Sequence, residues 1–128
     1  MRRNYVMDTI EARSAATAEL MNRFNDVFQR HDPAPLAAMI AEDCVIEKIS
    51  PAPDGDRCRG RDACVALWSE IATASGTHFD LEETYAMGDR AIIRWRLWTG
   101  PTASIRGVNL MKVRDGLIVE AMGYIKGA

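Results

Sequence analysis

The stretch AIIRWRLWTGPTASIRGVNLMKVRDGLIVEAMGYIK, residues 91–126, decides the fold of this chain. It predicts three consecutive strands over 91–98, 103–114 and 117–126, because polar and apolar residues alternate within each with a period of two. The turn Asp115-Gly116 between the last two strands is typical of a β-hairpin. Turns this short make neighbouring strands antiparallel, so the stretch predicts a sheet built from hairpins.

One face of these strands mixes polar and apolar side chains in a way that a plain core would not. Its predicted members are Ile92, Arg94, Arg96, Asn109, Met111 and Ile125. We interpret this face as the wall of a small-molecule pocket. Two other interpretations remain open: Arg94 and Arg96 both lie on an outer face and pair with surface acids, or Asn109 simply bonds a backbone group.

The preceding 90 residues predict three helices and two more strands. Leu20, Phe24 and Val27 recur at helical spacing in a long amphipathic helix over 9–30. The other expected elements are a helix with the stripe Leu36, Met39 and Ile40, a strand over 44–49, a helix opened by Gly60 and closed by Gly76, and a strand over 77–87. Residues 1–8 read as a loose lead-in. The whole predicts a single α+β domain over 1–128, with a strongly curved mixed or antiparallel sheet wrapped around the helices as a cone.

Composition narrows the possible functions. The chain has 128 residues, 48% hydrophobic and 27% charged, and a formal net charge of −2. This balance gives no electrostatic reason to expect nucleic acid or an anionic membrane as partner. No apolar run suits a membrane span or a secretion signal, so we expect a cytoplasmic protein. Cys44, Cys58 and Cys64 fit reduced, mostly buried thiols, and neither a metal nor an organic cofactor is expected.

Several short motifs, in this order, resemble the nuclear transport factor 2-like superfamily and its SnoaL-like group. They cover about residues 14–127 and read Ala41-Glu42-Asp43-Cys44-Val45, Pro51-Ala52-Pro53-Asp54-Gly55, Arg59-Gly60-Arg61-Asp62-Ala63, Gly88-Asp89-Arg90, Arg94-Trp95-Arg96, Arg106-Gly107-Val108-Asn109, Val113-Arg114-Asp115-Gly116 and Tyr124-Ile125-Lys126-Gly127. The resemblance implies a conical α+β fold, a pocket between helices and concave sheet, and usually a dimer. It does not imply one activity, because isomerases, epoxide hydrolases, cyclases and noncatalytic binders share the fold.

The residue sets of three enzymes in that group do not carry over intact. Ketosteroid isomerases use a carboxylate base where this chain offers Lys48, a tyrosine where it has Phe24, and a carboxylic acid where it has Asn109. A one-residue shift of the first strand would place Glu47 inside instead, and that register stays open. Limonene epoxide hydrolases use an arginine that aligns with Arg94, but this chain lacks the two acidic partners of that arginine. SnoaL-like cyclases use a carboxylate on the last strand, where this chain has small residues such as Gly123.

The resulting functional hypothesis is a cavity protein acting on a small, mostly apolar molecule with a carbonyl or carboxylate group. It would be an isomerase, lyase or cyclase working through an enol-like intermediate. Arg94 and Asn109 would orient or polarise the substrate oxygen, with Arg96 assisting. Glu83, paired with Arg94 or Arg96, would either hold that arginine in place or act as the base. The expected substrate-binding residues are Phe24, Lys48, Trp68, Ile92, Arg96, Met111 and Gly123. The alternative is a noncatalytic hydrophobic-ligand binder or dimeric accessory protein.

The opposite face of the last strands suggests self-association. Its predicted members are Ile93, Trp95, Leu97, Val108, Leu110, Met122 and Tyr124. A sheet face exposed to solvent is normally more polar than this. We therefore expect a homodimer formed through the convex face of the sheet.

Overall fold

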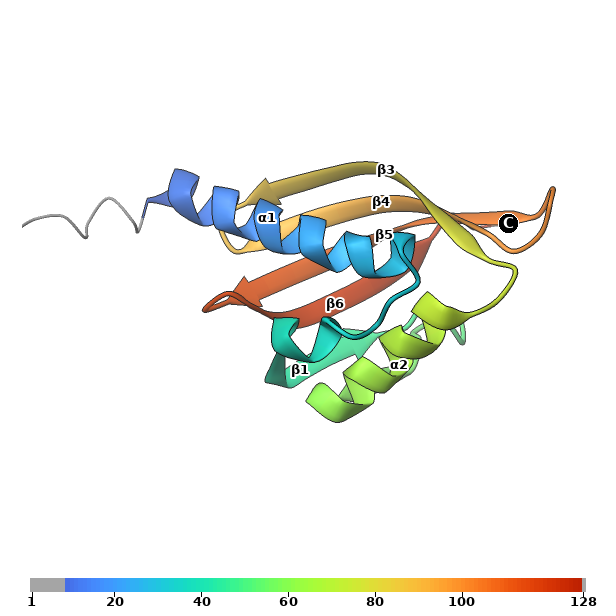
Figure 1. Cartoon of the computed structure of the whole chain (residues 1–128), viewed down its shortest axis with the longest axis horizontal. Coiled ribbons are helices and arrows are strands. Elements are labelled where there is room, and N and C mark those ends of the chain that lie inside the picture. The colour runs from blue at the N-terminus through green and yellow to red at the C-terminus, as the bar shows by residue number, and fades with distance from the viewer. Residues whose placement is uncertain (1–8, 128) are drawn as a thin grey trace, which may run out of the picture.

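The fold is α+β, and the computed structural model describes residues 9–127. The predicted lead-in over 1–8 lies outside the described residues. In chain order the elements are α1 (Ile10–Gln29), η2 (Leu36–Met39), β1 (Ile40–Glu47), β2 (Arg57–Arg59), α2 (Arg61–Thr73), β3 (His78–Met87), β4 (Arg90–Trp98), β5 (Ser104–Arg114) and β6 (Leu117–Ile125). Figure 1 shows α1 lying along β3 and β4, and α2 beside β1, with the sheet curving around both helices.

The six strands form one mixed sheet in the order β2-β1-β6-β5-β4-β3. The last three connections are hairpins between antiparallel neighbours, which confirms the prediction from residues 91–126. β1 joins the sheet parallel to β6. The sheet stays open, because β2 and β3 form its two edges.

The helical half differs from the prediction at one point. The expected second helix is only a short 3-10 turn, η2, and the chain enters β1 directly after it. Ile40 already pairs with Ile118 of β6 there, so its backbone bonds belong to the sheet. Residues 9–127 therefore contain two α-helices, where the sequence predicted three. Within residues 9–127, neither α-helix combines the length and the apolar character that a membrane crossing would need.

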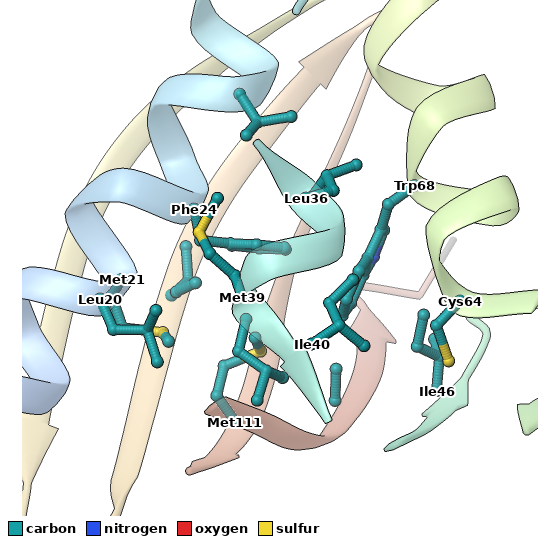
Figure 2. Packing of buried hydrophobic residues seen from close by; sticks show 14 of the residues in the cluster. Leu20, Met21, Phe24, Leu36, Met39, Ile40, Ile46, Cys64, Trp68 and Met111 are labelled. Carbon is teal, nitrogen blue, oxygen red and sulfur yellow. The ribbon is translucent and has the colours of Figure 1, made fainter. Parts of the chain in front are cut away.

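The core lies between the two helices and the concave face of the sheet. Figure 2 shows Phe24 of α1, Met39 of η2 and Trp68 of α2 converging there above Met111 of β5. Cys44 and Cys64 are also fully buried, as expected for small apolar side chains. Burial raises the pKa of both thiols, which keeps them protonated and unreactive at neutral pH.

A buried polar link attaches α1 to the turn between β3 and β4. Thr17 Oγ1 donates a hydrogen bond to the Gly88 carbonyl at 2.6 Å, and the Gly88 N–H donates to Ser14 Oγ at 2.7 Å. Gly88 has a positive φ of 58°, which suits glycine at this turn. Both backbone groups of Gly88 are therefore satisfied by one face of α1, and this fixes the helix against the sheet.

Thr17→Val tests this link, because valine keeps the shape of threonine and removes its hydroxyl. The Gly88 carbonyl would then be buried without its partner, and we expect the free energy of unfolding to fall by about 1–3 kcal/mol in urea titrations. Thr73→Val is the matched control, since that hydroxyl makes an exposed hydrogen bond within its own helix. It should change stability by less than about 0.5 kcal/mol. Equal effects of the two substitutions would contradict the role given to Thr17.

Candidate functional site

A pocket of about 260 Å³ opens between the helices and the concave face of the sheet. Its lining is mostly aliphatic and aromatic. The lining residues are Phe24, Asn25, Phe28, Ile46, Glu47, Lys48, Ile49, Leu67, Trp68, Ile71, Phe79, Leu81, Ile93, Trp95, Leu97, Asn109, Ala121 and Gly123. An apolar concavity with a few polar groups is the usual form of a small-molecule site. Within residues 9–127, no cluster of three or more His, Cys, Asp or Glu side chains has the geometry to hold a metal ion.

The main polar feature of the pocket is the pair formed by Trp95 and Asn109. Trp95 Nε1 donates a hydrogen bond to Asn109 Oδ1 at 3.1 Å across β4 and β5. An indole N–H can only donate, so the amide must turn its oxygen toward Trp95. The Nδ2 group of Asn109 then faces away from the indole, and among the described residues it has no hydrogen-bond acceptor. A neutral donor is thereby presented in an apolar pocket.

Two glycines make room for this arrangement. A Cβ at Gly107 would lie 2.7 Å and 2.8 Å from Cζ2 and Cη2 of Trp95, so the indole can lie over β5 only because position 107 has no side chain. A Cβ at Gly123 would lie 2.8 Å from Ile49 Cγ2 and 3.6 Å from Asn109 Oδ1. Gly123 therefore keeps the space beside the Asn109 amide open.

Edge-to-face aromatic contacts shape the apolar walls. Phe24 meets Trp68 with ring centroids 4.8 Å apart and Phe28 at 5.0 Å. Phe79 of β3 meets Trp95 at 5.6 Å. These contacts join α1, α2 and the sheet, and such geometry adds to the energy of burial alone. The walls are consequently built from rigid rings.

Glu47 and Lys48 border the pocket at the end of β1. Ile46 pairs with Ala121 and is buried, while Glu47 pairs with Met122, so alternation places Lys48 on the pocket side of the strand. Glu47 Oε2 accepts a hydrogen bond from Arg57 Nη2 at 2.9 Å. Among residues 9–127, Lys48 forms no salt bridge. Alternation favours Lys48 as the inward residue, but Lys48 lies just beyond the end of β1 and both residues border the pocket, so the choice between them stays a prediction.

The prediction that Ile92, Arg94 and Arg96 face the pocket is wrong. Their neighbours Ala91, Ile93 and Trp95 are the buried residues of β4, so the arginines lie on the opposite, outer face of the sheet. The alternative interpretation, in which Arg94 and Arg96 pair with surface acids on an outer face, is the one that the structure supports. Glu83 does pair with Arg94, with 2.9 Å between Oε1 and Nη1, as hypothesised, but its side chain is 46% exposed on that outer face. A role for Glu83 as a base in the pocket does not follow.

The charged cluster on the outer face continues beyond this pair. Arg106 donates two hydrogen bonds to Glu82, at 3.0 Å and 2.7 Å, and these hold the pKa of Glu82 below its usual value. Arg96 donates to Ser104 Oγ at 2.8 Å. Met111, also predicted to touch substrate, lies in the core beneath the pocket. The arginines are therefore occupied by surface acids and a hydroxyl.

A β-bulge in β3 explains why Glu83 does not face the pocket as predicted. Leu81 pairs with Trp95 and the next pair is Glu83 with Arg94, so Glu82 is an extra residue. An inserted residue exchanges the two faces of the strand from that point on. Phe79 and Leu81 line the pocket, whereas Tyr85 and Met87, which unbroken alternation would put on the same face, are exposed on the outer face. Nothing in the local sequence marks the position of the bulge.

Of the predicted site residues, Phe24, Lys48, Trp68, Asn109 and Gly123 do line the pocket. Sequence reasoning missed Trp95, which it placed with Ile93 and Leu97 on the convex face, and it missed Asn25. The signal for Trp95 was present: Ala91, Ile93, Trp95 and Leu97 alternate with the mostly charged series Arg90, Ile92, Arg94 and Arg96, a pattern typical of a strand with one buried face. Asn25 had no such signal, because one polar residue beside an apolar stripe is common on helices.

Comparisons with known proteins agree with this geometry. A family model described as SnoaL-like domain matches residues 21–121. The chain is 68% identical to an NTF2-like protein of unknown function from Mesorhizobium loti, over 90% of this chain and 94% of that chain, with a TM-score of 0.88. No protein with a curated description matches the chain.

Two more distant structures share the fold. A steroid delta-isomerase from Pseudomonas aeruginosa is 15% identical, with 88% of this chain and 81% of that chain covered and a TM-score of 0.74. An LEH-like epoxide hydrolase from M. tuberculosis is 19% identical, with 88% and 84% covered and a TM-score of 0.69. At these identities the likeness shows the fold alone. The family match over most of the chain, together with the shared cone-shaped architecture, shows that this protein belongs to the SnoaL-like domain family and has the nuclear transport factor 2-like fold.

Proposed function

We propose that the protein binds a small, mostly apolar molecule through one carbonyl or carboxylate oxygen, and that it does so as a noncatalytic binder. The observation that carries the proposal is the Trp95–Asn109 hydrogen bond, which leaves Asn109 Nδ2 as an oriented donor in the apolar pocket. The ligand oxygen would accept from Nδ2, and its carbon skeleton would lie against Phe24, Trp68 and Ile93.

The size of the pocket limits the ligand. Pockets for drug-sized molecules are about 300–1,000 Å³, and this one is about 260 Å³. A molecule with one or two rings suits that volume. Burial against the aromatic walls would supply most of the affinity, at about 25 cal/mol per Å² of apolar surface. The Asn109 donor, with the Lys48 ammonium at the pocket border, would select for an oxygen.

The positions and ion pairs of Glu47 and Glu83 favour simple binding over enolisation of the ligand. Removal of a proton from carbon needs a positioned base. Among the described lining residues, Glu47 is the only acid, and its carboxylate is held by Arg57. Glu83, the base expected from the sequence, lies on the other face of the sheet. Its ion pair with Arg94 supports a binder over an enzyme.

Asn109→Asp tests the proposed contact. Aspartate keeps an oxygen for the Trp95 indole but replaces the Nδ2 donor with a second acceptor, which would repel a ligand carbonyl. With 2-decalone, a bicyclic ketone, as probe, we expect the dissociation constant measured by calorimetry to rise at least about tenfold. Arg94→Met is the control: on the outer face, it should leave binding unchanged within a factor of about two.

The reverse pattern, weaker binding in Arg94→Met and unchanged binding in Asn109→Asp, would contradict the pocket assignment. A separate experiment tests whether the protein catalyses enolisation: the exchange of the α-protons of 2-decalone for deuterium in D₂O is followed by NMR. Exchange that depends on the protein and disappears in Glu47→Gln would identify an enolising enzyme with Glu47 as its base.

We also propose that the outer face of the sheet forms a homodimer interface. Val108, Leu110, Met122 and Tyr124 support it, whereas Ile93, Trp95 and Leu97, expected there, line the pocket instead. Cross-strand pairing aligns an apolar row over four strands: Tyr85, Ile92, Leu110 and Met122. Ile92 is 39% and Leu110 38% exposed in the single chain. A contiguous apolar row beside an Arg–Glu cluster resembles an interface with an apolar centre and a charged rim.

Leu110→Glu should separate the dimer, because it would bury a charge in the centre of the apolar row. Sedimentation velocity at micromolar concentration should give twice the chain mass of 14.2 kDa for the wild type and the single mass for the variant. Ala15→Glu, on the exposed side of α1, should remain dimeric. A wild-type protein that sediments with the mass of one chain would refute the proposed interface.

A further inference from the structure

Asn25 of α1 is another polar side chain of the pocket, and the proposed contact with Asn109 does not use it. We infer that Asn25 Oδ1 accepts a hydrogen bond from a hydroxyl of the ligand, so that the ligand class narrows to hydroxylated cyclic ketones. This inference rests on the proposed function, because it assumes a ligand whose carbonyl is bound at Asn109.

Asn25 is buried and incompletely bonded. It is 7% exposed, and it follows Phe24 on the face of α1 that turns toward the sheet. Its Nδ2 donates one long hydrogen bond, 3.4 Å, to Thr84 Oγ1. With the amide in that orientation, Oδ1 has no donor among residues 9–127. A buried carbonyl oxygen with free lone pairs is costly unless another molecule supplies a donor.

The surroundings explain why packing alone does not account for this asparagine. Its neighbours Phe24 and Phe28 are both aromatic walls of the pocket, and an apolar side chain at position 25 would cover the same space without a desolvation cost. The bond to Thr84 holds the amide plane while leaving its oxygen for the cavity. The combination suits an acceptor aimed at a ligand.

The strand register sets the spacing of the two polar contacts. Thr84, which holds Asn25, pairs with Ile93, and Ile93 pairs with Asn109, so the two contacts stand on one cross-strand row, two strands apart. Neighbouring strands are about 4.8 Å apart, which puts the backbones at positions 84 and 109 about 10 Å apart. A ligand that reaches both amides therefore carries its carbonyl and its hydroxyl at opposite ends. Fused bicyclic hydroxyketones, with one group on each ring, have this form.

The test compares 2-decalone with its isomers hydroxylated on the second ring, by calorimetry with the full chain. At least one hydroxylated isomer should bind the wild type about threefold to tenfold more tightly than 2-decalone, as expected for one net hydrogen bond. Asn25→Leu should bind both compounds equally, since leucine has a similar size and no acceptor. Asn25→Asp keeps the acceptor oxygen and should retain the preference. Thermal melts report whether each variant is folded, and the wild-type comparison stands without any variant.

Each other outcome overturns the inference in a distinguishable way. If no hydroxyl improves binding while Asn109→Asp still weakens the binding of 2-decalone, Asn25 is not a ligand contact and the proposed function stands. If the preference persists in Asn25→Leu, the hydroxyl is bound elsewhere. If neither 2-decalone nor any hydroxylated isomer binds, the inference and the proposed function fall together.

Discussion

The hydrogen bond from the Trp95 indole to the Asn109 side chain is the interaction on which the proposed binding site depends. It links β4 to β5 at 3.1 Å and sets the orientation of the amide. The bond depends on Gly107, whose missing side chain lets the indole lie over β5, and on Gly123, which leaves space beside the amide. Around it, the rings of Phe24, Trp68 and Phe79 form apolar walls, and the other polar lining residues are Asn25, Glu47 and Lys48. A neutral donor in such surroundings gains strength from the low local dielectric.

The two faces of the sheet have separate chemistry. The concave face carries neutral polar groups in an aromatic pocket, and the outer face carries the arginines and glutamates beside an apolar row. Surface ion pairs such as Arg94–Glu83 contribute little stability on their own. Several Arg–Glu pairs gather on this one face, and in the proposed dimer they would form the charged rim of the interface. In this proposal, ligand binding and self-association would use opposite sides of the same strands.

The fold was predictable from the sequence because its signals are local. Strand alternation and the turn at Asp115-Gly116 defined the hairpins, and the faces of β5 and β6 followed correctly. The faces of β3 and β4 were not recovered. The bulge at Glu82 has no sequence signature, and the resemblance to enzymes with a pocket arginine outweighed the simple alternation around Trp95. Asn25 became visible only through its burial, which depends on how α1 packs against the sheet.

The most direct measurement is the NMR spectrum of the side-chain amides and indoles during a titration with 2-decalone. If the Asn109 amide is the ligand contact, its Nδ2 protons and the Trp95 indole proton shift together and saturate, while the Arg94 Nε proton on the outer face does not move. If Asn109 and Trp95 stay unchanged throughout the titration, or if the shifts are confined to the outer face, the Trp95–Asn109 pair does not form the binding site.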